Sequence, residues 1–273
     1  EVLMPALIEL EECFEDEKHD KRFLAELADL YRSYIGRPTP LYFCANLSRK
    51  LGGAKIYVKN EGTAHTGAHK INHCVGQALL AKRMNKRRII AETGAGQLGL
   101  ASSAVAARFG FECLVYMGAI DVARQRPNVF WMEQFGAKVI PVEFGGKRLK
   151  DAVNAALKDW ITNVSSSHYL LGSCLGPHPF PEINRYFQKI VGEEIKELNR
   201  SEWQHATCSS AARSSLAAAV IGGLHHHDFR SARMGAAGEA VGGQHPGHLA
   251  AEDQHHRGEI EEEHRGGQGR QRG

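Results

Sequence analysis

The sequence predicts an α/β protein with parallel sheets covered by helices on both faces. Short apolar segments alternate with helical segments from residue 87 onward, as in chains of strand–helix–strand units. Two helix-to-strand junctions, at Gly110 and Gly136, lie 26 residues apart, the length of one strand–helix unit. The chain has 273 residues, of which 42% are hydrophobic and 24% charged, as in a large globular fold.

The first 84 residues predict helices around one short strand. Residues 3–16 and 19–33 carry apolar residues at the spacing of helices with one buried face, and "IGRPTPL" ends the second. Residues 54–60 ("AKIYVKN") predict a strand. The segment "HTGAHKINH" then predicts a glycine-containing turn and a helix over 71–84.

Regular alternation follows this helix. Glycine ends two of the predicted helices, and Asp121 is the expected N-cap of the second. Strands are predicted at 87–92, 111–118, 137–145 and 167–173, and helices at 98–110, 121–136 and 147–163.

The composition changes after about residue 198. Residues 201–273 contain no Lys, Asn or Tyr but nine of the 15 histidines. Too few large apolar residues are present to offset the entropy cost of ordering, so a disordered or non-native tail is predicted from about residue 199. A shifted reading frame would explain this composition. That hypothesis fails if neither other frame of the coding DNA yields a continuous α/β sequence.

Charge and cysteine content narrow the function classes. The net charge of +3 favours neither nucleic acid nor membrane, and no apolar run approaches the roughly 20 residues of a membrane helix. The six cysteines are scattered and the first twenty residues lack a signal-peptide pattern, which predicts a cytoplasmic protein. Adjacent histidines at 225–227 do not converge as ligands, so no metal site is predicted.

Lys70 lies where an amine can be activated. It stands between the glycine turn and the predicted helix, whose positive dipole end and burial would lower the pKa of its amine. Position alone is also typical of a solvated lysine at a helix start.

A second candidate site is "AETGAGQ" (91–97). Its predicted strand ends at Glu92, and a glycine turn then enters a helix whose N–H groups can bind a carboxylate or phosphate. Glu92 could act on a proton beside that anion. An ordinary turn with a solvated glutamate is the alternative, since the segment is neither a Walker loop nor GxGxxG.

Several longer segments resemble the tryptophan synthase β-subunit family over about residues 1–198. They are "HTGAHKIN", "AKRMNKRRIIAETGAGQ", "VYMGAIDVARQRPNVF", "LKDAVNAALKDW", "HYLLGS" and "GPHPFPEINRYFQKIVGEE". The resemblance implies a fold-type II enzyme that uses pyridoxal 5′-phosphate (PLP) to condense L-serine with indole to L-tryptophan. It also implies an α subunit that delivers indole and a β–β homodimer. A serine dehydratase or cysteine synthase is an alternative that shares the PLP lysine but does not predict the sequence segments "AETGAGQ" and "GPHPFP".

The resemblance also implies residue roles. Lys70 would hold PLP as a Schiff base, His69 would position the phosphate, and Ser173 would lie near the cofactor. Glu92 would be the acid/base that helps to expel the serine hydroxyl, and Lys150 would face the α subunit. The residues expected to bind the substrate carboxylate are Thr93, Gly94, Ala95, Gly96 and Gln97.

The chain departs from the family at several positions. Leu98 stands where the family has His in "GAGQHG", and "KNEG" (59–62) and His73 replace "KRED" and Asn or Gln, which would alter charge near the cofactor entrance. The glycine-rich phosphate cup expected after "GEE" is not matched. The alternative function is therefore an inactive truncated or frame-shifted remnant that binds the α subunit but not PLP.

The resemblance divides the chain between two domains. Residues 1–35 and 69–187 would form the N-terminal α/β domain, and 36–68 would belong to the second, cofactor-closing domain. Residues 188–273 would be a truncated remainder, in which a low-complexity tail replaces the C-terminal half.

Overall fold

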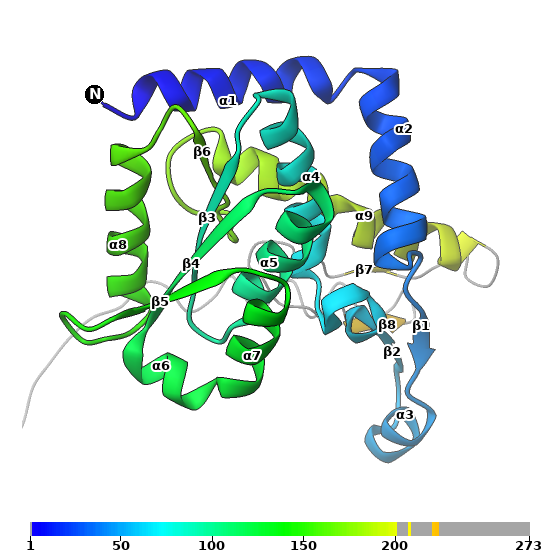
Figure 1. Cartoon of the computed structure of the whole chain (residues 1–273). Helices are drawn as coiled ribbons and strands as arrows, with labels where there is room; N and C mark the ends of the chain where they lie inside the picture. Colours follow the sequence, from blue (N-terminus) through cyan, green and yellow to red (C-terminus); the bar gives the residue numbers. More distant parts are fainter. Residues whose placement is uncertain (1, 201–206, 209–219, 224–273) are drawn as a thin grey trace, which may run out of the picture. The chain divides into compact units, whose positions relative to one another are not determined.

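A four-stranded parallel sheet confirms the predicted fold class (Figure 1). The computed structural model describes residues 2–200, 207–208 and 220–223. The chain divides into two units, Glu1–His227 and Asp228–Gly273, and all described residues lie in the first. The strands, in the order β5-β4-β3-β6, are β5 (Lys138–Val142), β4 (Glu112–Gly118), β3 (Arg88–Thr93) and β6 (Ser167–Tyr169).

The sheet register places β3 between β4 and β6. Ile90 of β3 pairs with Leu114 of β4 and with Tyr169 of β6, so β3 is a central strand. Residues 89–93 are all buried, which explains the apolar run at residues 89–91. β6 is shorter than predicted and stops at Tyr169, opposite Ile90 in the middle of β3.

Helices cover both faces of this sheet (Figure 1). Helix α8 packs on one face, and α5 packs on the other with α4 and α7 against it. Their bounds are α4 (Lys70–Arg83), α5 (Gln97–Phe109), α6 (Ala119–Arg124), α7 (Arg126–Gln134) and α8 (Leu149–Thr162).

The predicted helix over 121–136 is two helices. Asp121 lies inside α6 and does not cap it, and Gln125 leaves the helical conformation at φ −112° and ψ 34°. Pro127 explains the break, because it has no N–H to continue the helical hydrogen bonding through this turn. Gly136 follows the second helix at φ 82°, as expected for a glycine at a helix C-terminus.

The N-terminal helices pack on α4, and their Phe14 and Phe23 rings contact Phe187 of α9 (Phe180–Arg200). Asp20 caps α2 (Lys21–Leu30) by accepting a 2.7 Å hydrogen bond from the Phe23 N–H. The preceding helix is α1 (Met4–Glu17), and a π-helical turn, η1 (Tyr31–Ile35), follows α2. No described helix carries an apolar stretch of the length needed to cross a bilayer.

A separate antiparallel sheet joins residues 41–59 to residues near 220. Its strands, in order, are β1 (Leu41–Phe43), β2 (Lys55–Lys59), β8 (Val220–Gly223) and β7 (Thr207–Cys208). The sequence predicts no regular structure after residue 199. The structure differs from that prediction at β8, whose backbone pairs with β2. The rest of that tail, with the histidines at 225–227, lies outside the described residues. The domain boundaries stay a prediction.

Three short helices complete this region: α3 (Ala45–Leu51), η2 (Glu61–Thr63) and η3 (His65–Gly67). Asn60, exposed, accepts a 3.1 Å hydrogen bond from the Gly62 N–H and so caps η2. In "KNEG", Lys59 and Glu61 are buried, and the two substituted positions, Asn60 and Gly62, are both exposed.

Two helical glycines should respond oppositely to alanine. A Cβ at Gly76 in α4 would lie 2.4 Å from the Phe187 ring, whereas a Cβ at Gly192 in α9 meets nothing within 4 Å. Overpacking costs about 1–3 kcal/mol, whereas alanine gains about 0.5–1 kcal/mol over glycine in a helix. We therefore expect Gly76→Ala to lower and Gly192→Ala to raise the urea midpoint of unfolding. Equal shifts would contradict the packing of Phe187.

Candidate active site

Lys70 is the first residue of α4, and its amine is partly desolvated. The Nζ atom donates a hydrogen bond to the backbone oxygen of Gly172, just beyond β6. Burial lowers the pKa of Lys70, while the Cys74 thiol, Glu92 and the Cys174 thiol oppose this shift. The amine therefore lies at the carboxyl end of the parallel sheet, where ligands bind in such folds.

Glu92 lies near the end of β3 and is only 6% exposed. Burial raises the pKa of its carboxyl to about 7, and the Tyr169 hydroxyl and Lys70 oppose the rise. The Oε2 atom has no hydrogen-bond partner. The carboxyl is therefore close to half-ionised at neutral pH, the state in which one group can both donate and accept a proton.

The turn after β3 is fixed by side chains on both sides. Thr93 Oγ1 accepts a 3.1 Å hydrogen bond from the Gly96 N–H, and Asn128 of α7 donates a 2.8 Å bond to the Ala95 oxygen. Gly96 has φ 94°, and a Cβ there would lie 2.6 Å from the Asn128 side chain, so only glycine fits. No side chain caps α5, which begins at Gln97 and leaves its first N–H groups available to an anion.

Buried polar atoms without a partner gather near Lys70. They include both ring nitrogens of His69 and Nε2 of His73, whereas the Glu92 carboxyl and the Tyr169 hydroxyl interact with each other. Burial, with a contribution from Lys70, lowers the pKa of His69 to about 4, so its ring is neutral. Unpaired buried polar groups cost free energy. These atoms therefore suit a polar ligand that also engages the Lys70 amine, and PLP is such a group.

Leu98 and Gly172 form the wall beside the amine. Leu98 is buried, and a Cβ at Gly172 would lie 2.4 Å from its Cδ2 atom. The half-buried Ser173 follows Gly172. The leucine thus places apolar surface on the residue whose carbonyl accepts from Lys70.

His73 lies in the core and not at an entrance, contrary to the expectation from the sequence. Gln77 donates from Nε2 to the Leu171 oxygen at 2.9 Å and approaches His73 Nδ1 at 3.1 Å. Its Oε1 lies 3.3 Å from His168 Nε2. Burial lowers the pKa values of both histidines, so they are neutral and add no charge near Lys70.

Lys150 lies apart from this set. It is exposed on the first turn of α8, and no ion-pair partner is found for it among the described residues. Its neighbour Leu149 packs against the glycine turn, since a Cβ at Gly94 would lie 3.3 Å from the Leu149 Cβ. The structure thus brings together residues 69–70, 92–97 and 173, and leaves Lys150 outside the group.

Sequence reasoning missed Gly172, Asn128 and Tyr169. Gly172 acts through its backbone oxygen, and Asn128 and Tyr169 are distant in sequence from the groups they touch or face. A surface hollow of about 610 Å³ lies on α8 and is lined by Tyr116 and Asp159 among others. None of the predicted site residues lines it. Within residues 2–200 and the two short strands beyond, no three His, Cys, Asp or Glu side chains form a metal-binding group.

Comparison with known proteins places this arrangement in a family. The family described as "Pyridoxal-phosphate dependent enzyme" matches residues 32–258. The fold resembles diaminopropionate ammonia lyase from Escherichia coli in its apo form, with a TM-score of 0.53 and 19% identity over 65% of this chain and 52% of that one.

The same lyase in complex with D-serine gives a TM-score of 0.54 at 19% identity, covering 65% of this chain and 49% of that one. The chain therefore spans about half the length of these solved structures. The likeness shows a shared fold, and the match over residues 32–258 shows that the chain belongs to the pyridoxal-phosphate dependent enzyme family.

Proposed function

We propose that this chain is a tryptophan synthase β chain, which condenses L-serine with indole in a PLP-dependent reaction. The observation that carries the proposal is the position of the Lys70 amine. It lies at the carboxyl end of the sheet, on the Gly172 oxygen, and interacts with a buried Glu92 whose pKa is raised to about 7. An amine and a carboxyl of this kind are what such a reaction requires.

Three residues would bind different parts of the cofactor. Lys70 would attach the cofactor covalently, because desolvation increases the fraction of its amine that is unprotonated. His69, neutral and with both ring nitrogens free of partners, would hold the phosphate, with Ser173 beside it. When bound, PLP supplies an electron sink for negative charge that develops on an amino-acid substrate.

The turn after β3 would bind the substrate, and Glu92 would transfer protons to and from it. α5 begins at Gln97 without a side-chain cap, and the backbone N–H groups of its first turn would bind the serine carboxylate. Glu92 would donate a proton to the departing serine hydroxyl and accept one when indole adds, as its raised pKa allows at neutral pH. Leu98 would exclude water at the side of the amine.

The sequence segments that resemble tryptophan synthase favour serine and indole over other amino-acid chemistry. The E. coli ammonia lyase, solved with D-serine and with an aminoacrylate–PLP intermediate, supports an amino-acid substrate more generally. The resemblance also supports an α subunit partner near Lys150, a β–β homodimer and a cytoplasmic location, and these belong to the same proposal.

A second candidate function is a non-catalytic chain that binds the α subunit without PLP. Two observations favour it: Leu98 replaces a polar residue beside the carboxylate turn, and Lys150 is exposed independently of the Lys70 site. The phosphate cup, which the family places after "GEE", is not matched in the sequence.

An absorbance titration with PLP separates these functions. We expect the wild-type chain to develop the visible band of a lysine-bound cofactor and Lys70→Ala to lose it. Lys150→Ala should keep the band, because that exposed lysine lies outside the site. Serine and indole are then added to the wild-type protein, and tryptophan is measured.

Two results would reject the catalytic function. One is the absence of any band that depends on Lys70, and the other is a bound cofactor without tryptophan formation. Binding of a purified α subunit that weakens in Lys150→Ala but not in Lys70→Ala would then support the second candidate.

A further inference from the structure

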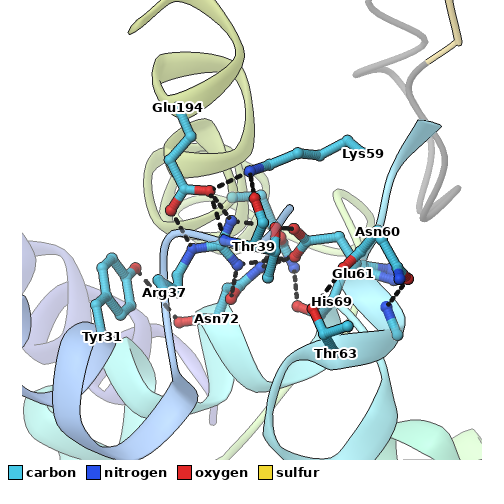
Figure 2. Close-up of polar contacts among 12 residues, drawn as sticks. Tyr31, Arg37, Thr39, Lys59, Asn60, Glu61, Thr63, His69, Asn72 and Glu194 are labelled. Atoms are coloured by element: carbon cyan, nitrogen blue, oxygen red, sulfur yellow. Dashed lines mark hydrogen bonds and ion pairs between the residues drawn. The ribbon is translucent and has the colours of Figure 1, made fainter. Parts of the chain in front are cut away.

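Figure 2 shows a buried network of charged and polar side chains that reaches Asn72, in the first turn of α4. Arg37 is at its centre. It donates to Glu194 from Nε at 2.7 Å and from Nη2 at 2.9 Å, and to Glu61 from Nη1 at 2.8 Å and from Nη2 at 3.0 Å. Lys59 pairs with Glu194 at 2.5 Å. Two cations thus face two carboxylates, and all four residues are at most 7% exposed.

The network is nearly saturated with hydrogen bonds. Thr39 donates from Oγ1 to Glu61 at 2.5 Å and from its N–H to Glu194 at 3.3 Å. Burial alone would raise the pKa of Glu61, but hydrogen bonds from Arg37, Thr39 and Asn72 outweigh it and hold the pKa below its ordinary value. A buried, fully paired network resists displacement, because moving one member leaves a charge unpaired.

Asn72 connects this network to the first turn of α4. Its Oδ1 accepts from Arg37 at 2.8 Å, and its Nδ2 donates to Glu61 at 3.0 Å and to Gln188 at 3.2 Å. Gln188, in α9, also donates a 3.0 Å bond from Nε2 to the backbone oxygen of His69. Groups outside α4 therefore hold the backbone immediately before Lys70 and the side chain two residues after it.

We propose that Gln188 and Asn72 are positioning residues for Lys70: they transmit the fixed geometry of the Arg37–Glu61–Glu194 network to the start of α4 and so keep the Lys70 amine against the Gly172 carbonyl. The importance of that geometry for catalysis rests on the proposed function. The geometric claim itself concerns the amine alone and can be measured without cofactor.

The test is competitive labelling of the cofactor-free, full-length chain with a limiting amount of acetic anhydride. Mass spectrometry of peptides gives the extent of reaction at Lys70 relative to the exposed Lys150 in the same sample. Gln188→Ala removes the bonds to Asn72 and to the His69 oxygen without leaving a buried charge. We expect relative labelling of Lys70 to rise about three- to tenfold, the population change that a lost hydrogen bond of ordinary strength allows.

Asn163→Ala is the matched control. It also removes two hydrogen bonds made by a side-chain amide, both to Asp159, at the far end of α8 from the Lys70 site. A merely destabilising effect would raise Lys70 labelling in both variants, whereas positioning raises it only in Gln188→Ala.

Asn72→Ala extends the test by removing all three hydrogen bonds of the Asn72 side chain, two to the network and one to Gln188. We expect a rise in Lys70 labelling at least as large as in Gln188→Ala. If Asn72→Ala does not fold, Gln188→Ala decides alone. Unchanged labelling in folded Gln188→Ala, or an equal rise in Asn163→Ala, would overturn the inference. A chain that binds no PLP but shows the selective rise would refute the proposed function and retain the positioning role.

Discussion

Under the proposed function, Glu92→Gln should lower the rate of tryptophan formation by about 10²–10⁴-fold, the usual contribution of a general acid or base. Glutamine retains the shape and hydrogen bonding of the side chain but cannot transfer a proton. The wild-type pH profile of kcat/KM should contain an ionisation near pH 7, since burial raises the pKa of Glu92 to about that value. That ionisation should be absent from the profile of the variant.

The same substitution should increase stability at neutral and alkaline pH. The carboxyl has a folded-state pKa of about 7, above its ordinary value of 4.5, so folding loses stability as the pH rises from about 4.5 through 7. Glutamine has no such ionisation. Glu92→Gln should therefore match the wild-type free energy of unfolding near pH 4 and exceed it by up to about 3 kcal/mol at pH 8.

Urea unfolding at pH 4 and pH 8, together with steady-state rates between pH 5 and 9, measures both effects. Glu112→Gln is the control, because Glu112 is an exposed carboxylate at the other end of the sheet, on β4. It should change neither quantity. A variant that loses activity and stability together would contradict the environment described for Glu92.

Arg37→Met should lower the free energy of unfolding by about 3–5 kcal/mol, the cost of removing one partner from a buried ion pair. Methionine fills part of the volume, but Glu61 and Glu194 would then face only Lys59 and the neutral donors around them. The defect should shrink as the pH falls from 7 towards 4, because protonation of either carboxyl removes an unpaired buried charge.

Arg32→Met supplies a close control for Arg37→Met. Arg32 pairs with Asp29 at 2.7 Å, as short as the bond from Arg37 to Glu194, but its side chain is 77% exposed. Solvent screens such a pair, so its loss should cost less than about 1 kcal/mol. Similar urea midpoints for the two variants would show that the network contributes no more than a surface pair.

The fold class could be predicted because its determinants are local. Strands such as β3 read as apolar runs, and helices end at glycines such as Gly110, whose φ is 76°. Lys70 and Glu92 could be selected for the same reason, as a lysine at a helix start and a carboxylate at a strand end. Pro127 is visible in the sequence, but the helical pattern on both sides of it predicts one helix where the structure has two.

The surroundings of the site could not be predicted, because they depend on contacts between distant segments. Arg37 and Glu194 are 157 residues apart, and no periodicity relates them. Lys59 ends an ordinary strand and reads as a surface lysine, yet it is fully buried. The partner of Lys70 is a backbone oxygen 102 residues away, and every residue type has one.

These separations also set an order of events during synthesis. Gln188 leaves the ribosome 119 residues after His69, an interval on the order of ten seconds at ordinary rates of translation. Until α9 has emerged, the His69 oxygen lacks its hydrogen bond from Gln188, and Arg37 lacks the Glu194 carboxylate with which it pairs. The nascent chain therefore carries Lys70 as an ordinary flexible amine, and the geometry of its site is completed late in biogenesis.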